Sequence, residues 1–148
     1  MPRTLSLRCR KVLSHAVLPD CPHGPGEDAG MDLYAAEDIR LQPGLWKAVR
    51  TGIAIQLPSG YEGQIRPRSG LASKHGVTLL NAPGTIDPGY RGEIRVLLVN
   101  LGPLPYQVSA GDRIAQLVVA QYASVRWLEV ESLDASSRDA GGFGSTGR

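Results

Sequence analysis

The chain has 148 residues, enough for one domain of ordinary size that needs no metal or disulfide for stability. Its 16 basic and 14 acidic side chains give a net charge of +2, which argues against a dedicated basic nucleic-acid clamp. No apolar run approaches the ~18 residues that a membrane-spanning helix needs. We therefore expect neither a nucleic-acid partner nor a membrane partner. The 18 glycines and 11 prolines favour many short strands joined by tight turns over long helices.

The cysteines and the N-terminus bear on metal binding and location. Cys9 and Cys21 form no C-x-x-C pair and the three histidines are widely spaced, so we expect no zinc site. Reduced thiols of this kind are typical of a cytosolic protein, and we expect a cytoplasmic location. Arg8, Arg10 and Lys11 interrupt any apolar core of a secretory signal, although composition alone leaves an organellar presequence open.

Alternating apolar residues between turn signals predict a series of short β-strands. The predicted strands are residues 52–57, 61–66, 77–81, 93–100, 106–109 and 113–122. The Pro-Ser-Gly turn at 58–60 predicts that the first two strands form a hairpin. Only residues 69–75 suggest a helix, of about two turns. The pattern predicts an all-β sandwich, jelly roll or barrel with one short helix.

The end of the chain differs in composition from the rest. After Leu133 the residues are mainly Ser, Asp, Gly and Ala, and four of the last eight residues are glycine. The only phenylalanine, Phe143, lies here, either in a flexible terminus or in an arm that stacks on a ligand. We expect a β-rich domain at residues 1–133 and a flexible arm at 134–148. Residues 142–147 match G-x-x-x-x-G, but no Lys-Ser/Thr pair follows, so a Walker-type NTPase is not expected.

Four polar clusters each allow a structural and a functional interpretation. Asp87-Pro88-Gly89 is typical of a type II turn, in which Asp87 is only a turn former. Ser69 is a candidate N-cap of the short helix, whose first N–H groups also suit an anion. Gln116, in an apolar run, either satisfies a backbone group or contacts a ligand. Asp32 follows a glycine-containing loop and either ends a strand or belongs to a site.

Taken together, five segments carry a family resemblance. In order, the chain reads AGMDLYA, PRSGLASKHG, NAPGTIDPGYRG, GDRIAQLVV and RDAGGFGSTG. In this order the segments resemble the five motifs of the trimeric dUTP diphosphatase (dUTPase) family, and the resemblance runs from about Leu5 to Arg148. It implies a jelly-roll-like protomer in a homotrimer, with active sites shared between subunits. The implied reaction is Mg²⁺-assisted hydrolysis of dUTP to dUMP and pyrophosphate, which limits uracil incorporation into DNA and supplies dUMP for dTMP synthesis.

The resemblance also implies roles for individual residues. In the family, the residue matching Asp87 orients and deprotonates the water that attacks the α-phosphorus. Arg68 would support the site near that water, and Gln116 would hold the phosphate chain. The residue matching Tyr90 packs on the deoxyribose and excludes a 2′-hydroxyl. Asp32 would meet the Mg²⁺ through water.

Three further groups of substrate contacts are implied. The uracil edge would be read by Asn81, Gly84, Thr85 and Ile86; the phosphates would be held by Ser69 and Gly70; and the arm of a third subunit would supply Arg138, Phe143, Gly144, Ser145 and Thr146. The family usually has Arg-Gly before the Gly-Gly-Phe of the arm, whereas here Asp139 follows Arg138. Unless it points to solvent, the Asp139 carboxylate would lie beside the γ-phosphate and is expected to weaken closure of the arm over the substrate modestly.

Two other functions stay open. A dCTP deaminase shares the fold and the Ile-Asp-Pro-Gly stretch at 86–89, but the position matching its catalytic Glu is Leu97, which cannot transfer protons. A non-catalytic β-sandwich binding module would use the same motifs only as turns. Triphosphate hydrolysis needs positioning and an oriented water more than a covalent nucleophile, and the chain offers no Ser-His-Asp set. Pyrophosphate from dUTP, ammonia from dCTP, or neither product would distinguish the three.

Overall fold

The computed structural model describes residues 4–145 and 147. These residues form eleven short strands and one helix, and thus an all-β fold of the predicted class. The elements are β1 (Arg8–Lys11), β2 (Met31–Tyr34), β3 (Ile39–Leu41), β4 (Trp46–Arg50), β5 (Ile53–Gln56), β6 (Tyr61–Arg66), α1 (Ser69–His75), β7 (Val77–Leu79), β8 (Gly84–Ile86), β9 (Arg95–Asn100), β10 (Tyr106–Val108) and β11 (Arg113–Gln121).

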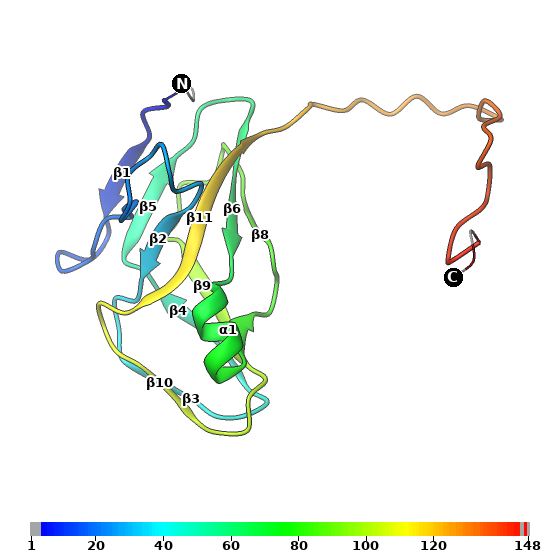
Figure 1. The fold of residues 1–148 in the computed structure, drawn as a ribbon. Helices are drawn as coiled ribbons and strands as arrows, with labels where there is room; N and C mark the ends of the chain where they lie inside the picture. The colour runs from blue at the N-terminus through cyan, green and yellow to red at the C-terminus, as the bar shows by residue number, and fades with distance from the viewer. Residues whose placement is uncertain (1–3, 146, 148) are drawn as a thin grey trace.

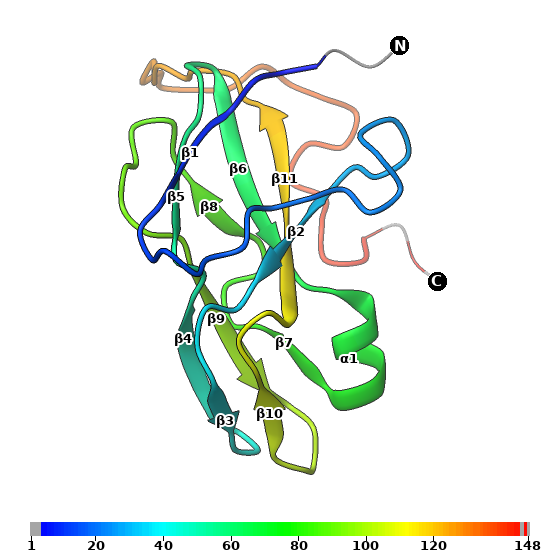
Figure 2. The same cartoon turned by 90° about the vertical axis from the view of Figure 1, so that its left-hand side faces the viewer.

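The strands form antiparallel sheets around one interior (Figures 1 and 2). The largest sheet has the order β2-β11-β6-β8, and a second has the order β4-β9-β7. Two further pairs, β1-β5 and β10-β3, complete the body. In the four-stranded sheet β8 is an edge strand, so its outer backbone groups have no strand partner there.

The core is aliphatic, and β9 contributes much of it. Val96 and Leu98 are fully buried, as the apolar run in this strand predicted. Asn100 is also fully buried, and its amide nitrogen donates to the carbonyl oxygens of Leu41 (3.0 Å) and Leu104 (2.8 Å). Its side-chain oxygen accepts a hydrogen bond from the backbone N–H of Gly102 (2.9 Å). This buried amide therefore has partners within the fold and a structural role.

The predicted hairpin at 52–66 is wrong, although both of its strands exist. β5 pairs with β1, whereas β6 pairs with β11 and β8. The turn itself forms, because the N–H of Tyr61 donates to the carbonyl of Pro58 (3.2 Å). The chain thus passes from one sheet to another at this turn, and distant segments complete both sheets.

Two local predictions also need correction. The helix has the predicted bounds, but its N-cap is Arg68, which makes no side-chain capping bond, and Ser69 is the first helical residue. At the Asp87 turn the N–H of Tyr90 donates to the Asp87 carbonyl (3.0 Å), yet Gly89 lacks the positive φ that a type II turn requires. The segment before it, which is not among the predicted strands, contains strand β8.

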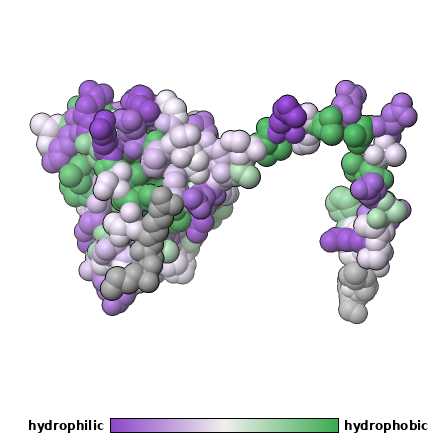
Figure 3. All heavy atoms as spheres, turned by 90° about the horizontal axis from the view of Figure 1, so that it is seen from above, coloured by the Kyte–Doolittle hydropathy of each residue, from purple (hydrophilic) through white to green (hydrophobic). Residues whose placement is uncertain are grey.

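The chain leaves the body after β11 and runs outward as an extended segment (Figures 1 and 3). Residues 123–133, which the sequence analysis placed in the body, are exposed there; Trp127 is 93% exposed and Leu133 87%. Among the described residues, no helix is long and apolar enough to cross a membrane.

Candidate active site

The first cavity, of about 250 Å³, lies along β8 and the start of β9 and is called here the β8 pocket. It is lined by Ile65, Asn81, Gly84, Thr85, Ile86, Asp87, Tyr90, Glu93, Ile94, Arg95 and Leu97. Outside the arm, all of the residues predicted to contact uracil or deoxyribose lie in this group, together with the predicted base, Asp87. The structure therefore brings these residues into one place.

The backbone of β8 suits recognition of a flat polar group. β8 pairs with β6 through the registers Gly84↔Ile65 and Ile86↔Gly63 and has no strand partner on its other side. That side presents backbone donors and acceptors, which can pair with the edge of a base. Glycine at position 84 leaves room for Asn81, since an added Cβ would lie 3.1 Å from the Asn81 amide nitrogen.

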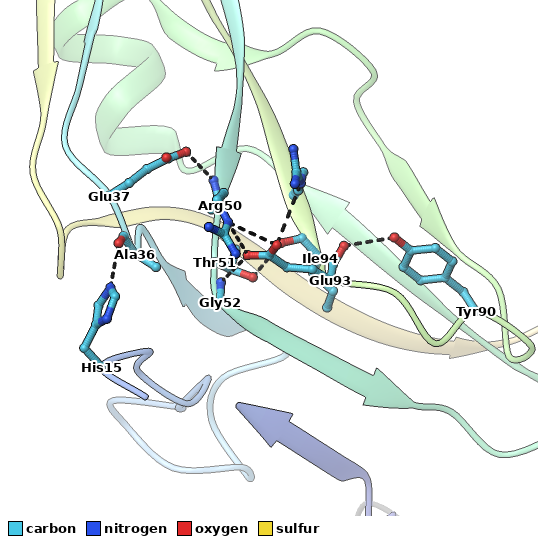
Figure 4. A network of polar contacts seen from close by, with 10 residues as sticks. His15, Ala36, Glu37, Arg50, Thr51, Gly52, Tyr90, Glu93 and Ile94 are labelled. Atoms are coloured by element: carbon cyan, nitrogen blue, oxygen red, sulfur yellow. Dashed lines mark hydrogen bonds and ion pairs between the residues drawn. The ribbon is translucent and has the colours of Figure 1, made fainter. Parts of the chain in front are cut away.

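Tyr90 is anchored by a network that the sequence analysis missed (Figure 4). Its hydroxyl donates to the carbonyl oxygen of Glu93 (2.9 Å). The Glu93 carboxylate in turn accepts hydrogen bonds from Arg50 Nε (3.1 Å to each oxygen) and from the backbone N–H of Gly52 (2.9 Å). The only sequence signal was an acidic residue opening an apolar strand. The hydrogen-bond partners of its carboxylate lie more than 40 residues away, although Arg95 also pairs with it at 3.8 Å. Glu93 is thus committed to holding the loop that carries Tyr90.

Of the two carboxylates in the β8 pocket, that of Asp87 is the more accessible. Its side chain is exposed and makes no hydrogen bond or ion pair with any described residue. The other carboxylate, Glu93, has both oxygens engaged. An accessible carboxylate with free lone pairs can accept a proton from a bound water, whereas Glu93 is poorly placed to do so.

The second cavity, of about 410 Å³, lies beside the start of α1 and is called here the α1 pocket. It is lined by Pro22, His23, Asp28, Gly30, Asp32, Arg68, Ser69, Gly70, Arg113 and Gln116. All of the residues predicted for the phosphates and the metal outside the arm lie here. Arg113, His23 and Asp28 were missed, because their place at this pocket depends on the pairing of β2 with β11 and on the loop before β2.

Two arginines pair with Asp32, one at each carboxylate oxygen. Arg68 Nε lies 3.2 Å from one carboxylate oxygen, and Arg113 Nε lies 3.0 Å from the other. Gln116 donates from its amide to the Pro67 carbonyl (3.0 Å), so the structural interpretation of Gln116 holds as well. Two guanidinium groups against one central carboxylate leave spare N–H donors, which favour an anionic ligand.

The loop before β2 forms one wall of the α1 pocket. Asp28 accepts hydrogen bonds from the backbone N–H of His23 (2.8 Å) and from its Nδ1 (3.1 Å). The hydrogen bond from the His23 backbone is the largest cause that holds the pKa of Asp28 below its usual value, and the bond from the His23 side chain is the next. The carboxylate therefore stays ionised and keeps the loop closed on itself.

The described arm residues line neither pocket of their own chain. Arg138 Nε donates to the Gly141 carbonyl (2.8 Å), and Phe143 is fully exposed on the extended segment. Gly144 and Ser145 follow Phe143 on the same segment, and Thr146 lies outside the described residues. The β8 and α1 pockets themselves share no lining residue.

The fold and the pockets together define a class of protein. It is a small all-β protein with one pocket for a flat hydrogen-bonding group and another for an anion, a combination that suits a nucleotide. The dUTPase family model matches residues 17–147, and the chain belongs to that family.

Relatives and solved structures agree with this assignment. The chain is 57% identical over 144 residues to a deoxyuridine 5′-triphosphate nucleotidohydrolase of Solibacter usitatus, with 97% of each chain covered. It is 52% identical to a protein of the same name from Anaplasma marginale, covering 97% of this chain and 99% of the relative. A dUTPase of Staphylococcus bacteriophage 80alpha, solved with dUpNHpp, superimposes with a TM-score of 0.89 at 26% identity, covering 98% of this chain and all of the other. A mutant dUTPase from phage phi11 of S. aureus, described as coordinating a structural Mg(II) ion, gives a TM-score of 0.81 at 26% identity and covers 88% of this chain and all of the other.

Proposed function

We propose that this protein hydrolyses dUTP to dUMP and pyrophosphate by attack of water on the α-phosphorus. The observation that carries the proposal is that the residues expected for the base and sugar gather in the β8 pocket and those for the phosphates in the α1 pocket. The direct test is incubation with dUTP and Mg²⁺ followed by measurement of pyrophosphate and dUMP. Absence of both products would contradict the proposal.

The chemistry follows from the two pockets. The edge of β8 and Asn81 bind the uracil, and Tyr90 packs on the sugar. Asp87 accepts a proton from the water while that water attacks the α-phosphorus, and pyrophosphate leaves. The guanidinium groups of the α1 pocket neutralise the charge that passes to the leaving group. Ser69, Gly70 and Gln116 contribute hydrogen bonds along the phosphate chain.

The donor set suits a Mg²⁺ ion held mainly by the substrate. Within residues 4–145 and 147, no group of three or more His, Cys, Asp or Glu side chains is placed to hold a metal ion. Asp32 has an arginine on each oxygen, which fits contact with the ion through water better than direct ligation. Mg²⁺ keeps several waters and binds readily to substrate phosphates, where it supplies charge neutralisation.

We further propose that the active unit is a homotrimer with shared sites. Among the described residues the two pockets of one chain share no lining residue, which favours a triphosphate nucleotide bound between pockets of neighbouring subunits. The outward segment (Figure 3) has exposed apolar side chains, namely Val125, Trp127, Leu128 and Leu133. Burial against another copy of the chain would remove this apolar surface from water. Light scattering should give three times the chain mass of 15.8 kDa. The cytoplasmic location is likewise proposed, on the two free cysteines.

Replacing Tyr90 with Ala is expected to weaken discrimination against UTP. The ring packs where a 2′-hydroxyl would lie, so its loss makes room for the ribose and also removes contact with the deoxyribose. We expect the dUTP/UTP ratio of kcat/KM to fall by about tenfold or more. Tyr90→Phe is the control, because it keeps the ring and loses only the bond to Glu93. An unchanged ratio in Tyr90→Ala would exclude this role.

Replacing Gly30 with Ala is expected to raise KM for dUTP about threefold while the protein stays folded. An added Cβ would overlap the side-chain oxygen of Gln116 and force that flexible side chain out of the α1 pocket. Gly26→Ala is the matched control, since a Cβ there meets no atom within 4 Å. Steady-state kinetics and thermal melting check both variants. Equal KM values in the two variants would show that Gln116 does not bind the substrate.

A dCTP deaminase activity is disfavoured by the same pocket. Leu97, at the position of the deaminase Glu, lines the β8 pocket and has no proton to give. Of the two carboxylates there, Glu93 is tied to Arg50 and Gly52. Ammonia release from dCTP is the measurement that would revive this alternative.

A further inference from the structure

A continuous chain of side-chain contacts runs from the loop before β2 into the α1 pocket. The Tyr34 hydroxyl donates to an Asp20 carboxylate oxygen at 2.6 Å. The Arg113 guanidinium lies over the Tyr34 ring, 5.5 Å from its centre. Arg113 then pairs with Asp32, and Asp32 pairs with Arg68. Asp20 and Tyr34 line neither the β8 pocket nor the α1 pocket.

An irregularity in β11 places Arg113 on the side of the sheet that faces this pocket. Gln116 pairs with Asp32 and Arg113 pairs with Tyr34, so β11 has one more residue than β2 over this stretch. The register shift falls between Arg113 and Ala115 and makes Ile114 the extra residue. Without it, the alternation of a strand would put Arg113 and Gln116 on opposite faces. With it, both side chains line the α1 pocket.

Tyr34 is a rigid support for an otherwise mobile side chain. It is only 9% exposed, whereas Arg113 is exposed and long. The ring attracts the guanidinium by a cation–π interaction, and the bond to Asp20 fixes the ring. That bond raises the pKa of Tyr34, so the phenol keeps the proton that it donates. The Nε of Arg113 pairs with Asp32, and the two terminal nitrogens of the guanidinium carry further N–H donors that suit an anion.

We propose that Tyr34, anchored by Asp20, is a positioning residue for the triphosphate: it orients Arg113 so that its guanidinium binds the phosphates that dUTP has and dUMP lacks. This inference rests on the proposed function. In that function the α-phosphorus lies beside Asp87 in the β8 pocket, so the α1 pocket takes the β- and γ-phosphates. The effect of Tyr34 should therefore depend on the length of the phosphate chain.

The test compares the binding of dUMP and of the non-hydrolysable analogue dUpNHpp, both with Mg²⁺, by calorimetry. We expect Tyr34→Phe and Asp20→Ala to weaken analogue binding about threefold, and Tyr34→Leu about tenfold. Binding of dUMP should change by less than about twofold in all three variants, because dUMP does not reach Arg113. Asp20→Asn keeps a hydrogen-bond acceptor and should restore most of the affinity lost in Asp20→Ala.

Tyr61→Phe is the matched control. The Tyr61 hydroxyl accepts a hydrogen bond from Gln121 (2.9 Å) away from both pockets. Loss of this hydroxyl should leave the affinities for dUMP and for the analogue unchanged. Unchanged analogue binding in Tyr34→Phe and Asp20→Ala, or an equal loss for dUMP and the analogue, would overturn the positioning role. A wild-type protein that releases no pyrophosphate from dUTP would instead overturn the proposed function, and the inference with it.

Discussion

Asp87→Asn is expected to lower kcat for dUTP by about 10²–10⁴-fold, the usual cost of losing a general base. The substitution keeps the size of the side chain and suits the turn, in which the Asp87 carbonyl accepts the N–H of Tyr90 (3.0 Å). It removes only the oxygen that takes the proton of the water. Because the Asp87 side chain makes no bond with the described residues, no structural contact is lost with it. KM should change far less than kcat.

Asp38→Asn is the matched control for this prediction. Asp38 is exposed, lies outside both pockets and accepts a hydrogen bond from the backbone N–H of Ala110 (2.7 Å), which the amide oxygen of Asn can also accept. Its kcat should equal that of the wild type. If Asp87→Asn also turned over saturating dUTP at the wild-type rate, the base would have to be another group.

The sequence predicted best what depends on neighbouring residues. The β8 pocket draws most of its functional groups from residues 81–90, and the start of α1 supplies Arg68, Ser69 and Gly70 to the other pocket. Short contiguous segments carry these residues, so motifs alone group them. The bounds of α1 were predictable for the same reason, since glycine follows it at position 76 with φ 67°.

What the sequence could not predict depends on contacts between distant segments. The hairpin at 52–66 was the natural local choice, but β5 buries its edge against β1 and β6 against β11. The partner of Glu93 is Arg50, 43 residues away, and Arg113 reaches the α1 pocket only through the register shift in β11. No spacing rule in one sequence reveals either contact.

The outward segment begins before residue 134, the predicted start of the arm, and there is a physical reason for the difference. Residues 125–133 contain enough apolar side chains to suggest body, and the sequence analysis therefore began the arm at 134. In the described part of the chain these residues stay exposed, and Val125 and Leu128 are 76% and 82% exposed. Composition reports how much apolar surface a segment has and not which chain covers it.

Truncation after Asp139 is expected to lower kcat/KM for dUTP by about 10²–10³-fold and leave the body folded. The arm would add stacking of Phe143 on the base, worth roughly 1–3 kcal/mol, and hydrogen bonds to phosphate of about 1.5–3 kcal/mol each. Part of this is offset by the backbone entropy of ordering the glycines, at ~1–2 kcal/mol per residue. The net stabilisation by the arm is then a few kcal/mol, and each 1.4 kcal/mol corresponds to about a tenfold change in kcat/KM. Light scattering and thermal melting should match the full chain, because the described residues of this stretch line neither pocket and Phe143 is fully exposed.

Phe143→Leu separates stacking from the rest of the arm. It keeps an apolar side chain and every arm residue that could bind phosphate but removes the flat ring, so it should lose less than the truncation, about tenfold in kcat/KM. A Phe143→Trp variant reports closure directly: its emission should shift on adding dUpNHpp, measured against the background of Trp46 and Trp127 in the wild type. Two results together would show that the arm is an ordinary flexible terminus. The emission of Phe143→Trp would not change on adding the analogue, and the truncated protein would be fully active.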